Sequence, residues 1–325
     1  MSETKDNVAA FIDRLLAGEV SALARAISLV EARNEIGGRI HRAIQTHSGR
    51  AQIVGITGPP GVGKSTLINA YITSLRRQNK RVAVVAVDPS SPLTGGSVLG
   101  DRTRMGRHSD DPEVFIRSVS ARGHLGGLSA TIHSVVDLID CAGWDIIVLE
   151  TVGTGQSETE VMEIADVNIV IIAPGLGDDV QAIKAGILEI ADILVINKSD
   201  TPMAIRTERQ LKAMLQLRHT DAQSVPVLQT TATEEKGIDD LAHAIEEKFF
   251  SSDDNDRKTR LLQRVRRQVA QEASEKIKHL VLSDASDTMN DLLLAIIEGK
   301  DNHENLLDII ITTYFSDSGL IGRPT

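Results

Sequence analysis

The sequence predicts a doubly wound α/β fold with a mostly parallel sheet and helical extensions at both ends. Three observations support this prediction. Between residues 51 and 235, apolar runs alternate with helical patterns, and nearly every residue within each run is apolar. A glycine-rich loop also separates the first apolar run from the helical pattern after it. Strands that are apolar on both faces are typical of parallel sheets covered by helices, where ligands bind at the carboxyl ends of the strands.

The order of these patterns divides the chain of 325 residues into three parts. Residues 1–48 show the spacing of amphipathic helices, interrupted at Gly18, and form a predicted N-terminal extension. Residues 49–250 hold the alternating strands and helices, and residues 251–325 return to helical spacing. The predicted strands are 52–57, 82–88, 145–151, 168–173, 193–197 and 225–230.

The C-terminal part is rich in apolar residues. Steps of three and four residues predict a long helix over 261–280 and shorter helices over 289–297 and 306–315. A helical region this apolar must be covered by the α/β domain or by another subunit, and our hypothesis is a homodimer built on this region. The long helix also carries a basic face, which we interpret as solvated because the chain as a whole is acidic.

Composition and charge exclude several classes of protein. A net charge of −10 and an aromatic content of 2% argue against nucleic acid as a partner. Cys141 is the single cysteine, which excludes an internal disulfide framework. No apolar run approaches the roughly 20 residues that span a bilayer, and the first residues are polar, with no signal-peptide core. We therefore expect a cytoplasmic protein with no membrane contact.

The glycine-rich loop has the pattern G-x-x-x-x-G-K-S over residues 58–65. Glycines let successive backbone N–H groups turn toward an anion, and the N-terminus of the following helix adds a partial positive charge. Lys64 can reach the β- and γ-phosphates, and the Ser65 hydroxyl can hold Mg²⁺. The predicted phosphate contacts are Gly58, Pro59, Pro60, Gly61, Val62, Gly63, Lys64, Ser65 and Thr66.

The base is indicated by the run Asn197-Lys198-Ser199-Asp200 at a predicted strand end, which is the N-K-x-D signature of guanine sites. A carboxylate at Asp200 can accept hydrogen bonds from N1–H and the N2 amino group of guanine, whereas adenine offers no such donor pair. An unpaired buried polar group costs about 1–3 kcal/mol, so we expect GTP rather than ATP. Backbone N–H groups expected behind the ring belong to Thr231, Ala232 and Thr233.

Acidic residues near the phosphate loop predict a metal site. Asp88 and Glu150 close two predicted strands, and Asp101 lies in the polar loop 88–107. Mg²⁺ prefers oxygen ligands and usually keeps several waters. We expect one or two of these carboxylates to bind the ion directly and the rest to act through water.

Three glycine-bearing loops follow predicted strands, over residues 88–107, 151–158 and 175–181. The first has the length and composition of a loop that orders around a γ-phosphate, so the set favours a switch over a bare hydrolase. Gln156 stands three residues beyond Gly153, not adjacent to it as in Ras-like switches. We therefore expect slow intrinsic hydrolysis that a partner raises by ordering the loops.

Two other functions remain compatible with a phosphate loop. A P-loop kinase would transfer the phosphate to a small molecule, and the loop alone does not separate the two reactions. A metal-insertion GTPase usually carries a Cys/His metal site, whereas Cys141 stands alone here among scattered histidines. The guanine signature and the three loops favour GTP hydrolysis.

Several long motifs together resemble the MeaB-type GTPases of the SIMIBI class and the eukaryotic methylmalonic aciduria type A protein. These motifs are residues 55–66 around the phosphate loop, the run 88–105 with its Gly-Gly-Ser and Gly-Asp-Arg-Thr-Arg stretches, and residues 150–158. The resemblance covers roughly residues 10–250. It implies a homodimeric GTPase that chaperones an adenosylcobalamin-dependent acyl-CoA mutase, chiefly methylmalonyl-CoA mutase. Such proteins gate cofactor delivery and removal, and the mutase stimulates hydrolysis of GTP to GDP.

The resemblance also implies roles for individual residues. By this resemblance, Lys64 and Ser65 contact the phosphate and Mg²⁺, and Lys64 is also a catalytic residue. The metal and active-site acids are Asp88, Asp101 and Glu150, and the base contacts are Asn197, Lys198 and Asp200. The switch and coupling residues are Gly153 and Gln156 in the second loop and Gly177, Asp178, Asp179 and Lys184 in and after the third.

Overall fold

A computed structural model of the chain divides into two compact units, Met1–Ala270 and Gln271–Thr325. In the first unit, the structure describes residues 2–32, 35–44, 47, 50–88, 106–120, 127–151, 162–175, 190–216 and 225–250. Beyond these it describes scattered residues between 259 and 283, then 286–300 and 302–315.

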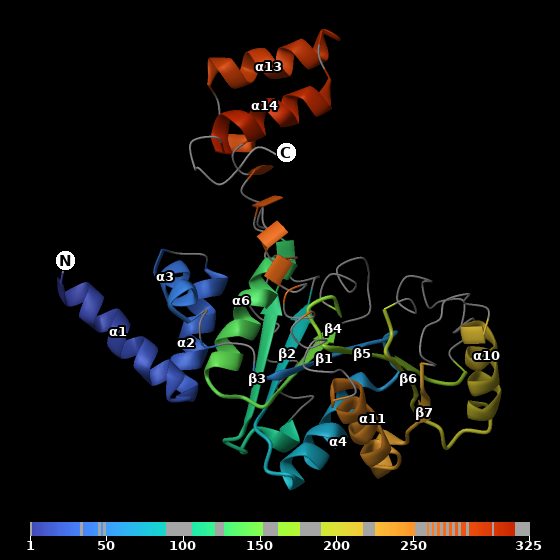
Figure 1. The fold of residues 1–325 in the computed structure, drawn as a ribbon. Coiled ribbons are helices and arrows are strands. Elements are labelled where there is room, and N and C mark those ends of the chain that lie inside the picture. The colour runs from blue at the N-terminus through green and yellow to red at the C-terminus, as the bar shows by residue number, and fades with distance from the viewer. Residues whose placement is uncertain are drawn as a thin grey trace. The chain divides into compact units, whose positions relative to one another are not determined.

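The first unit is built on a seven-stranded sheet with the strand order β3-β2-β4-β1-β5-β6-β7 (Figure 1). Each described strand pair is parallel, which confirms the predicted doubly wound α/β fold. The strands are β1 (Gln52–Thr57), β2 (Val82–Asp88), β3 (Val114–Ser120), β4 (Ile146–Thr151), β5 (Val167–Ile172), β6 (Ile193–Ile196) and β7 (Val227–Gln229). All six predicted strands are present, with ends within two residues of those expected.

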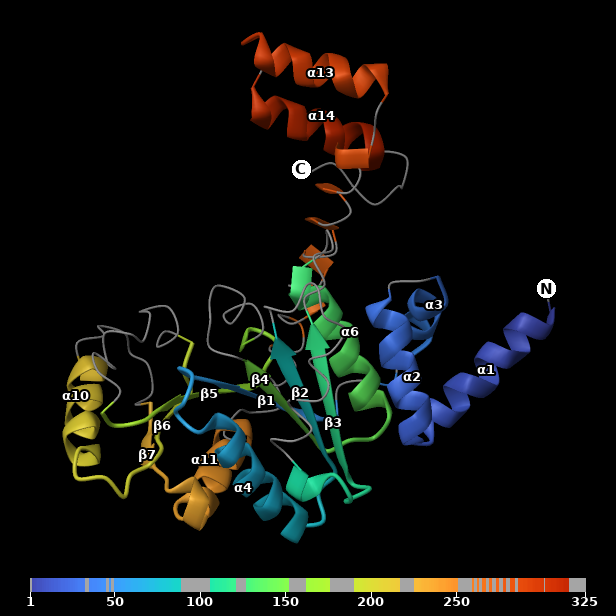
Figure 2. The same ribbon diagram turned by 180° about the vertical axis from the view of Figure 1, so that it is seen from behind.

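Helices cover both faces of this sheet. On one face lie α4 (Lys64–Arg77) and α11 (Ile238–Phe250), which are neighbours in both ribbon views (Figures 1 and 2). On the other lie α6 (Gly127–Cys141) and α10 (Ala204–Gln216). Successive side chains of a strand point to opposite faces, so residues on both faces of the central strands meet a helix layer and an all-apolar run is stable there. None of the described helices is long and apolar enough to cross a membrane.

The N-terminal helices pack onto the α6 side of the sheet. They are α1 (Ser2–Leu16), α2 (Val20–Glu31) and α3 (Glu35–Ile44). Leu23 and Ile27, one helical turn apart, are fully buried in the same hydrophobic core as α6. The predicted N-terminal extension therefore shares a core with the strands and belongs to the same compact unit.

Strand β3 was not among the predicted strands. It lies at the edge of the described sheet beside β2, and Phe115 and Val119 are buried against the core. Between them Arg117 forms an ion pair with Glu31 of α2. Because a charged residue and two serines interrupt this strand, a search for wholly apolar runs passes over it.

The second unit contains a pair of helices, α13 (Asp287–Ile297) and α14 (His303–Phe315), at the two places where short helices are predicted. The Ser286 hydroxyl caps α13 by accepting a hydrogen bond from the backbone N–H of Met289 at 3.2 Å. Met289 and Leu306 are buried between the helices, whereas Leu294 is 51% and Ile297 79% exposed. Much of the predicted long helix over 261–280 lies outside the described residues.

Candidate functional site

The phosphate loop joins β1 to α4, and two of its glycines fit because they lack a side chain. Gly63 caps α4 with φ +94°, and a Cβ built there would lie 2.5 Å from Nδ2 of Asn197. A Cβ on Gly58 would lie 2.2 Å from the carbonyl oxygen of Ile171 in β5. The loop therefore needs glycine for close approach as well as for its left-handed backbone.

Lys64 begins α4, and its side chain turns back over the loop. The residue is only 8% exposed. Its Nζ donates hydrogen bonds to the carbonyl oxygens of Gly58 at 2.7 Å and Pro59 at 3.1 Å. The ammonium group therefore lies over the loop to which the motif assigns the phosphates.

Two of the predicted metal residues are brought together at the carboxyl edge of the sheet. Ser65 Oγ donates a hydrogen bond to Glu150 Oε1 at 3.0 Å. Glu150 is 9% exposed and lies on β4, opposite Ile56 of β1. Hydroxyl and carboxylate oxygens are ligands that suit Mg²⁺, so this pair fits the predicted ion.

The other two predicted metal residues are less fully described. The backbone of Asp88 ends β2, which pairs with β4, so Asp88 and Glu150 share one edge of the sheet. The Asp88 side chain and the whole of Asp101 lie outside the described residues. The metal-binding roles therefore stay predictions.

Asn197 links the guanine motif to the phosphate loop. Its Nδ2 donates to the carbonyl oxygen of Val62 at 2.9 Å. Its Oδ1 accepts from Thr230 Oγ1 and from the backbone N–H of Ala232, both at 3.2 Å. With 2% exposure, the side chain is committed to holding three segments together, while its predicted contact with the base stays a prediction.

Lys198 and Asp200 occupy the more exposed part of the guanine motif. Lys198 has φ +57°, a left-handed conformation that costs a residue with a side chain about 1–2 kcal/mol. Its Nζ donates to the carbonyl oxygen of Gly61 at 2.8 Å, a second link to the phosphate loop. Asp200 is exposed and so remains accessible to a ligand. The pKa of Lys236 is raised, first by the hydrogen bond and charge of Glu234 and then by the charge of Asp200.

Two of the three predicted ring-backing residues use their N–H groups within the chain. Thr231 donates to the carbonyl oxygen of Lys236 at 3.0 Å, and Ala232 to Asn197 Oδ1 at 3.2 Å. Ala232 opens the short helix η3 (Ala232–Glu234), which also contains Thr233. These two N–H groups therefore organise the loop, and direct contact of the three residues with the base stays a prediction.

A buried pair of threonines was missed in the sequence. Thr151 Oγ1 donates to Thr57 Oγ1 at 2.7 Å, joining the last residues of β4 and β1. Both are almost completely buried. Thr151 is also the first residue of the predicted second switch loop, so this bond anchors the start of that loop to the strand that carries the phosphate loop. The pair could have been found from the sequence, because a threonine ends each of the two apolar runs directly before a glycine-bearing loop.

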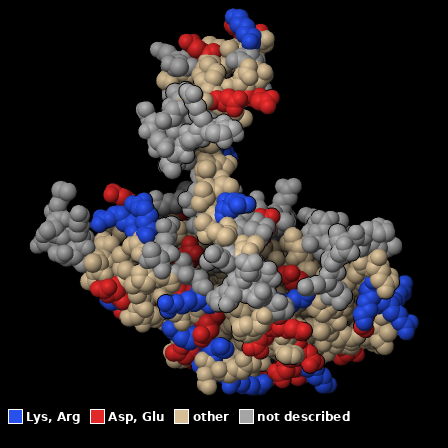
Figure 3. All heavy atoms as spheres, in the orientation of Figure 1, with Lys and Arg blue, Asp and Glu red and all other residues tan. Residues whose placement is uncertain are grey.

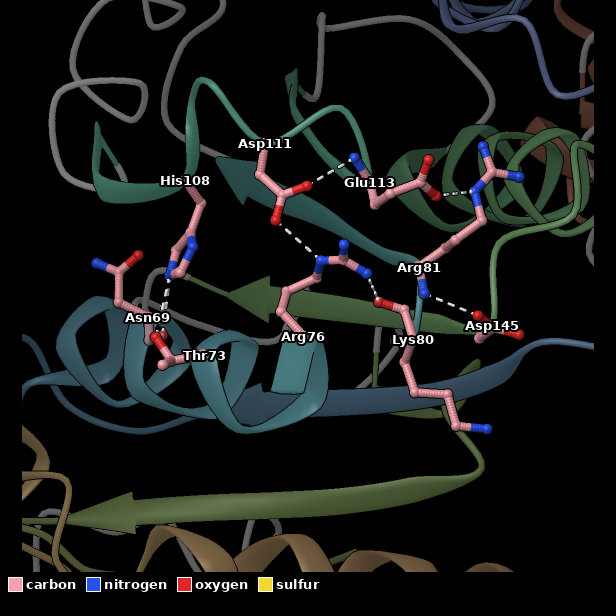
Figure 4. Close-up of polar contacts among 9 residues, drawn as sticks. All are labelled: Asn69, Thr73, Arg76, Lys80, Arg81, His108, Asp111, Glu113 and Asp145. Atoms are coloured by element: carbon pink, nitrogen blue, oxygen red, sulfur yellow. Dashed lines mark hydrogen bonds and ion pairs between the residues drawn. The ribbon is translucent and has the colours of Figure 1, made fainter. Parts of the chain in front are cut away.

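The chain that follows the predicted first switch loop is attached to α4 (Figure 4). The short helix η2 (Gly106–His108) ends at His108, whose Nε2 lies 3.1 Å from the carbonyl oxygen of Asn69 and 3.5 Å from Thr73 Oγ1. Asp111 Oδ2 then accepts from Arg76 Nε at 2.9 Å. These contacts join the return of the loop to the helix that begins with Lys64.

The same network continues to the start of β2. Arg76 donates to the carbonyl oxygen of Lys80 at 2.7 Å, and Arg81 Nε lies 2.7 Å from Glu113 Oε2. The backbone N–H of Arg81 donates to Asp145 Oδ2, also at 2.7 Å. Sequence reasoning did not find this network, because its partners come from segments that only the fold brings together (Figure 4).

The remaining predicted site residues lie outside the described residues. They are Gly153, Gln156, Gly177, Asp178, Asp179 and Lys184. The described part of the chain therefore does not test their switch and coupling roles, which stay predictions.

Cys141 is not placed as a metal ligand or nucleophile. Burial, followed by the charges of Asp140 and Asp137, raises the pKa of its thiol to about 12. The thiol is therefore neutral near pH 7, whereas metal binding and nucleophilic attack need the thiolate. In the part of the chain that the structure describes, no three His, Cys, Asp or Glu residues are arranged to hold a metal ion.

Comparison with known proteins is consistent with this geometry. The family model described as "Methylmalonyl Co-A mutase-associated GTPase MeaB" matches residues 23–290. The GTPase ArgK of Escherichia coli strain K12 is 39% identical over 94% of this chain and 97% of its own length. The methylmalonic aciduria type A homolog, mitochondrial, of Caenorhabditis elegans is 42% identical over 60% of this chain and 52% of its own.

A solved structure with a similar fold is named LAO/AO transport system kinase. It matches with a TM-score of 0.69 and 28% sequence identity. The match covers 95% of this chain and 98% of the chain in that structure. The parallel sheet, the phosphate loop and the guanine motif thus occur together in a chain that matches its relatives over most of its length. The chain belongs to the MeaB family of P-loop GTPases, and GTP and GDP are its nucleotides.

Proposed function

We propose that this GTPase is a chaperone that gates the loading of adenosylcobalamin into an acyl-CoA mutase of the methylmalonyl-CoA mutase type and protects that enzyme. The observation that carries the proposal is the family match over residues 23–290, because the family is described as mutase-associated. A cytoplasmic location is part of the same proposal.

In the proposed reaction, Lys64 donates hydrogen bonds to the transferred phosphate. Its buried ammonium, held by two loop carbonyls, supports this role. Ser65 and Glu150 would hold Mg²⁺ together with Asp88 and Asp101, directly or through water. When bound, the ion neutralises charge on the phosphate oxygens. Asp200 would select guanine, and Asn197 keeps the base motif fixed to the phosphate loop.

Slow hydrolysis alone and fast hydrolysis with a partner follow from the same proposal. The contacts of Figure 4 hold the return of the first loop to α4, so the start and the end of this segment are both attached to the sheet domain. The mutase would order the three loops, acting through Gly153, Gln156, Gly177, Asp178, Asp179 and Lys184. A partner that orders switch loops in this way can raise hydrolysis by orders of magnitude.

The proposal is tested by GTP hydrolysis of the purified chain, alone and with apo methylmalonyl-CoA mutase. We expect slow turnover alone, strong stimulation by the mutase, and no turnover in Lys64→Ala. Lys184→Ala should keep the basal rate and lose the stimulation.

Three other outcomes contradict parts of the proposal. Hydrolysis without stimulation would exclude this mutase as the client. A large basal loss in Lys184→Ala would make Lys184 catalytic. Absence of hydrolysis together with a phosphorylated small molecule in mass spectrometry would support a kinase.

A further inference from the structure

A cavity of about 200 Å³ lies between α4 and α11. Gln52 and Ile146, the first residues of β1 and β4, line it. The phosphate loop instead follows the other end of β1, after Thr57. The cavity is therefore at the opposite edge of the sheet from the nucleotide site, between two helices that lie side by side in Figures 1 and 2.

Tyr71 supplies an unpaired polar group to this cavity. The residue is 2% exposed and lines the cavity. Its hydroxyl has no hydrogen-bond partner among the described residues. Burial, followed by the charge of Glu246, raises the pKa of Tyr71, so the phenol stays neutral and can both donate and accept. Because Tyr71 lines the cavity, a ligand there would replace water as the hydrogen-bond partner of this hydroxyl.

The charges around the cavity are mainly negative. Asp239 and Glu246 line it from α11, where both are exposed, and they are two turns apart on one side of that helix. Ser74 Oγ donates to one oxygen of Asp239 at 2.8 Å, which fixes that carboxylate against α4. Among the described residues that line the cavity, Lys80 is the single lysine or arginine, and His243 of α11 also lines it. Figure 3 shows acidic side chains gathered on the face where α11 lies.

We propose that this cavity binds a small organic cation that carries one primary ammonium group. The ammonium would donate to the Glu246 and Asp239 carboxylates and to the Tyr71 hydroxyl, and these acceptors match its three N–H donors. Leu75 and Phe250 give the cavity apolar surface for a short carbon chain. Lys80 would repel a second positive charge, which favours a monoamine.

The size and position of the cavity fit this ligand class. Sites for drug-sized molecules usually measure roughly 300–1,000 Å³, so this cavity suits a smaller molecule. One of its walls, α4, begins at Lys64, and the other, α11, follows η3 of the base loop. A bound amine would therefore contact both helices that lead to the nucleotide site.

The test is calorimetric titration of the full chain with n-butylammonium chloride, with 1-butanol as the neutral probe of similar shape, at constant ionic strength. We expect saturable binding of the amine and none of the alcohol. Glu246→Gln should weaken binding about two- to fivefold, because its carboxylate is exposed and screened by solvent, and Tyr71→Phe should weaken it by a similar factor. The matched control is Glu247→Gln, an exposed neighbour on α11 that does not line the cavity and should bind as the native chain does.

Three results would overturn the proposal. Equal binding of amine and alcohol would show a merely apolar cavity. An equal loss in Glu247→Gln would show attraction to the acidic surface in general. The absence of saturable binding to the native chain would show that no amine site exists. Because the readout is binding and not hydrolysis, these results are independent of the mutase proposal.

Discussion

Gly61 and Gly63 of the phosphate loop share a left-handed backbone, but their surroundings differ. Their φ angles are +82° and +94°. A Cβ on Gly61 would meet no described atom within 4 Å, whereas on Gly63 it would lie 2.5 Å from Asn197 Nδ2. Alanine at either position would be strained by the left-handed backbone. Only at Gly63 would it also displace the Asn197 side chain, which links three segments.

We therefore predict different losses of stability from these two substitutions. Gly61→Ala should lower the free energy of unfolding by about 1–2 kcal/mol. Gly63→Ala should lower it by about 3–4 kcal/mol, because the Asn197 hydrogen bonds are also disturbed. Urea denaturation of the nucleotide-free chains measures both. Equal losses would mean that the close approach to Asn197 has no energetic consequence.

Asp200 permits a test of base selection without harm to the fold, because its side chain is exposed. Asp200→Asn replaces an acceptor by a group that both donates and accepts, which suits xanthine better than guanine. We predict that GTP affinity falls by about 1–3 kcal/mol and that xanthosine triphosphate binds better than GTP. Competition binding with both nucleotides measures this, and an unchanged melting temperature is the control. An untouched affinity for GTP would place the base site elsewhere.

At the scale of elements, a strand could be predicted from the sequence wherever apolar side chains predominate along the whole segment. Six strands could be predicted because most residues in each run are apolar. Strand β3 could not, since Arg117 and its serines make it look like a loop until Glu31 of α2 is placed opposite. The link from Asn197 to Val62 spans 135 positions of sequence and follows only from the strand order.

The attachment of the η2 segment to α4 can be tested through Asp111. Burial acts to raise the pKa of Asp111, but hydrogen bonds from Arg76 and from the backbone N–H of Glu113 outweigh it and hold this pKa below its usual value. A lowered pKa in the folded state means that the ionised carboxylate stabilises the fold above the unfolded pKa of about 4. This contribution is lost as the pH falls through the folded pKa.

We predict that Asp111→Asn lowers the free energy of unfolding by about 0.5–1 kcal/mol at pH 7, because the Arg76 pair is partly exposed. The difference from the native chain should shrink below about pH 4. Denaturation at both pH values measures it. Asp110→Asn, an exposed neighbour, is the matched control and should have no effect. An equal loss in both variants, or a loss independent of pH, would contradict the assigned role of the carboxylate.

At the scale of the whole molecule, the apolar residues of the C-terminal unit lead to a prediction about assembly. Leu294 and Ile297 of α13 and Leu307 of α14 are exposed although they are large and apolar. We predict a homodimer in light scattering, and a monomer after Ile297→Lys. The control Asp291→Lys introduces the same side chain at an exposed polar position of α13 and should leave the dimer intact. A native chain that scatters as a monomer would contradict the predicted homodimer.

The proposed function requires that the nucleotide bound at the phosphate loop be coupled to a mutase client. Its most direct test is the affinity of the full chain for apo methylmalonyl-CoA mutase, measured with a non-hydrolysable GTP analogue and with GDP. Coupling energies of about 1–3 kcal/mol are typical of linked sites, so we predict affinities that differ by about fivefold or more. The difference should vanish in Lys64→Ala. Equal affinities of the native chain in the two nucleotide states would mean that nucleotide and mutase binding are not coupled.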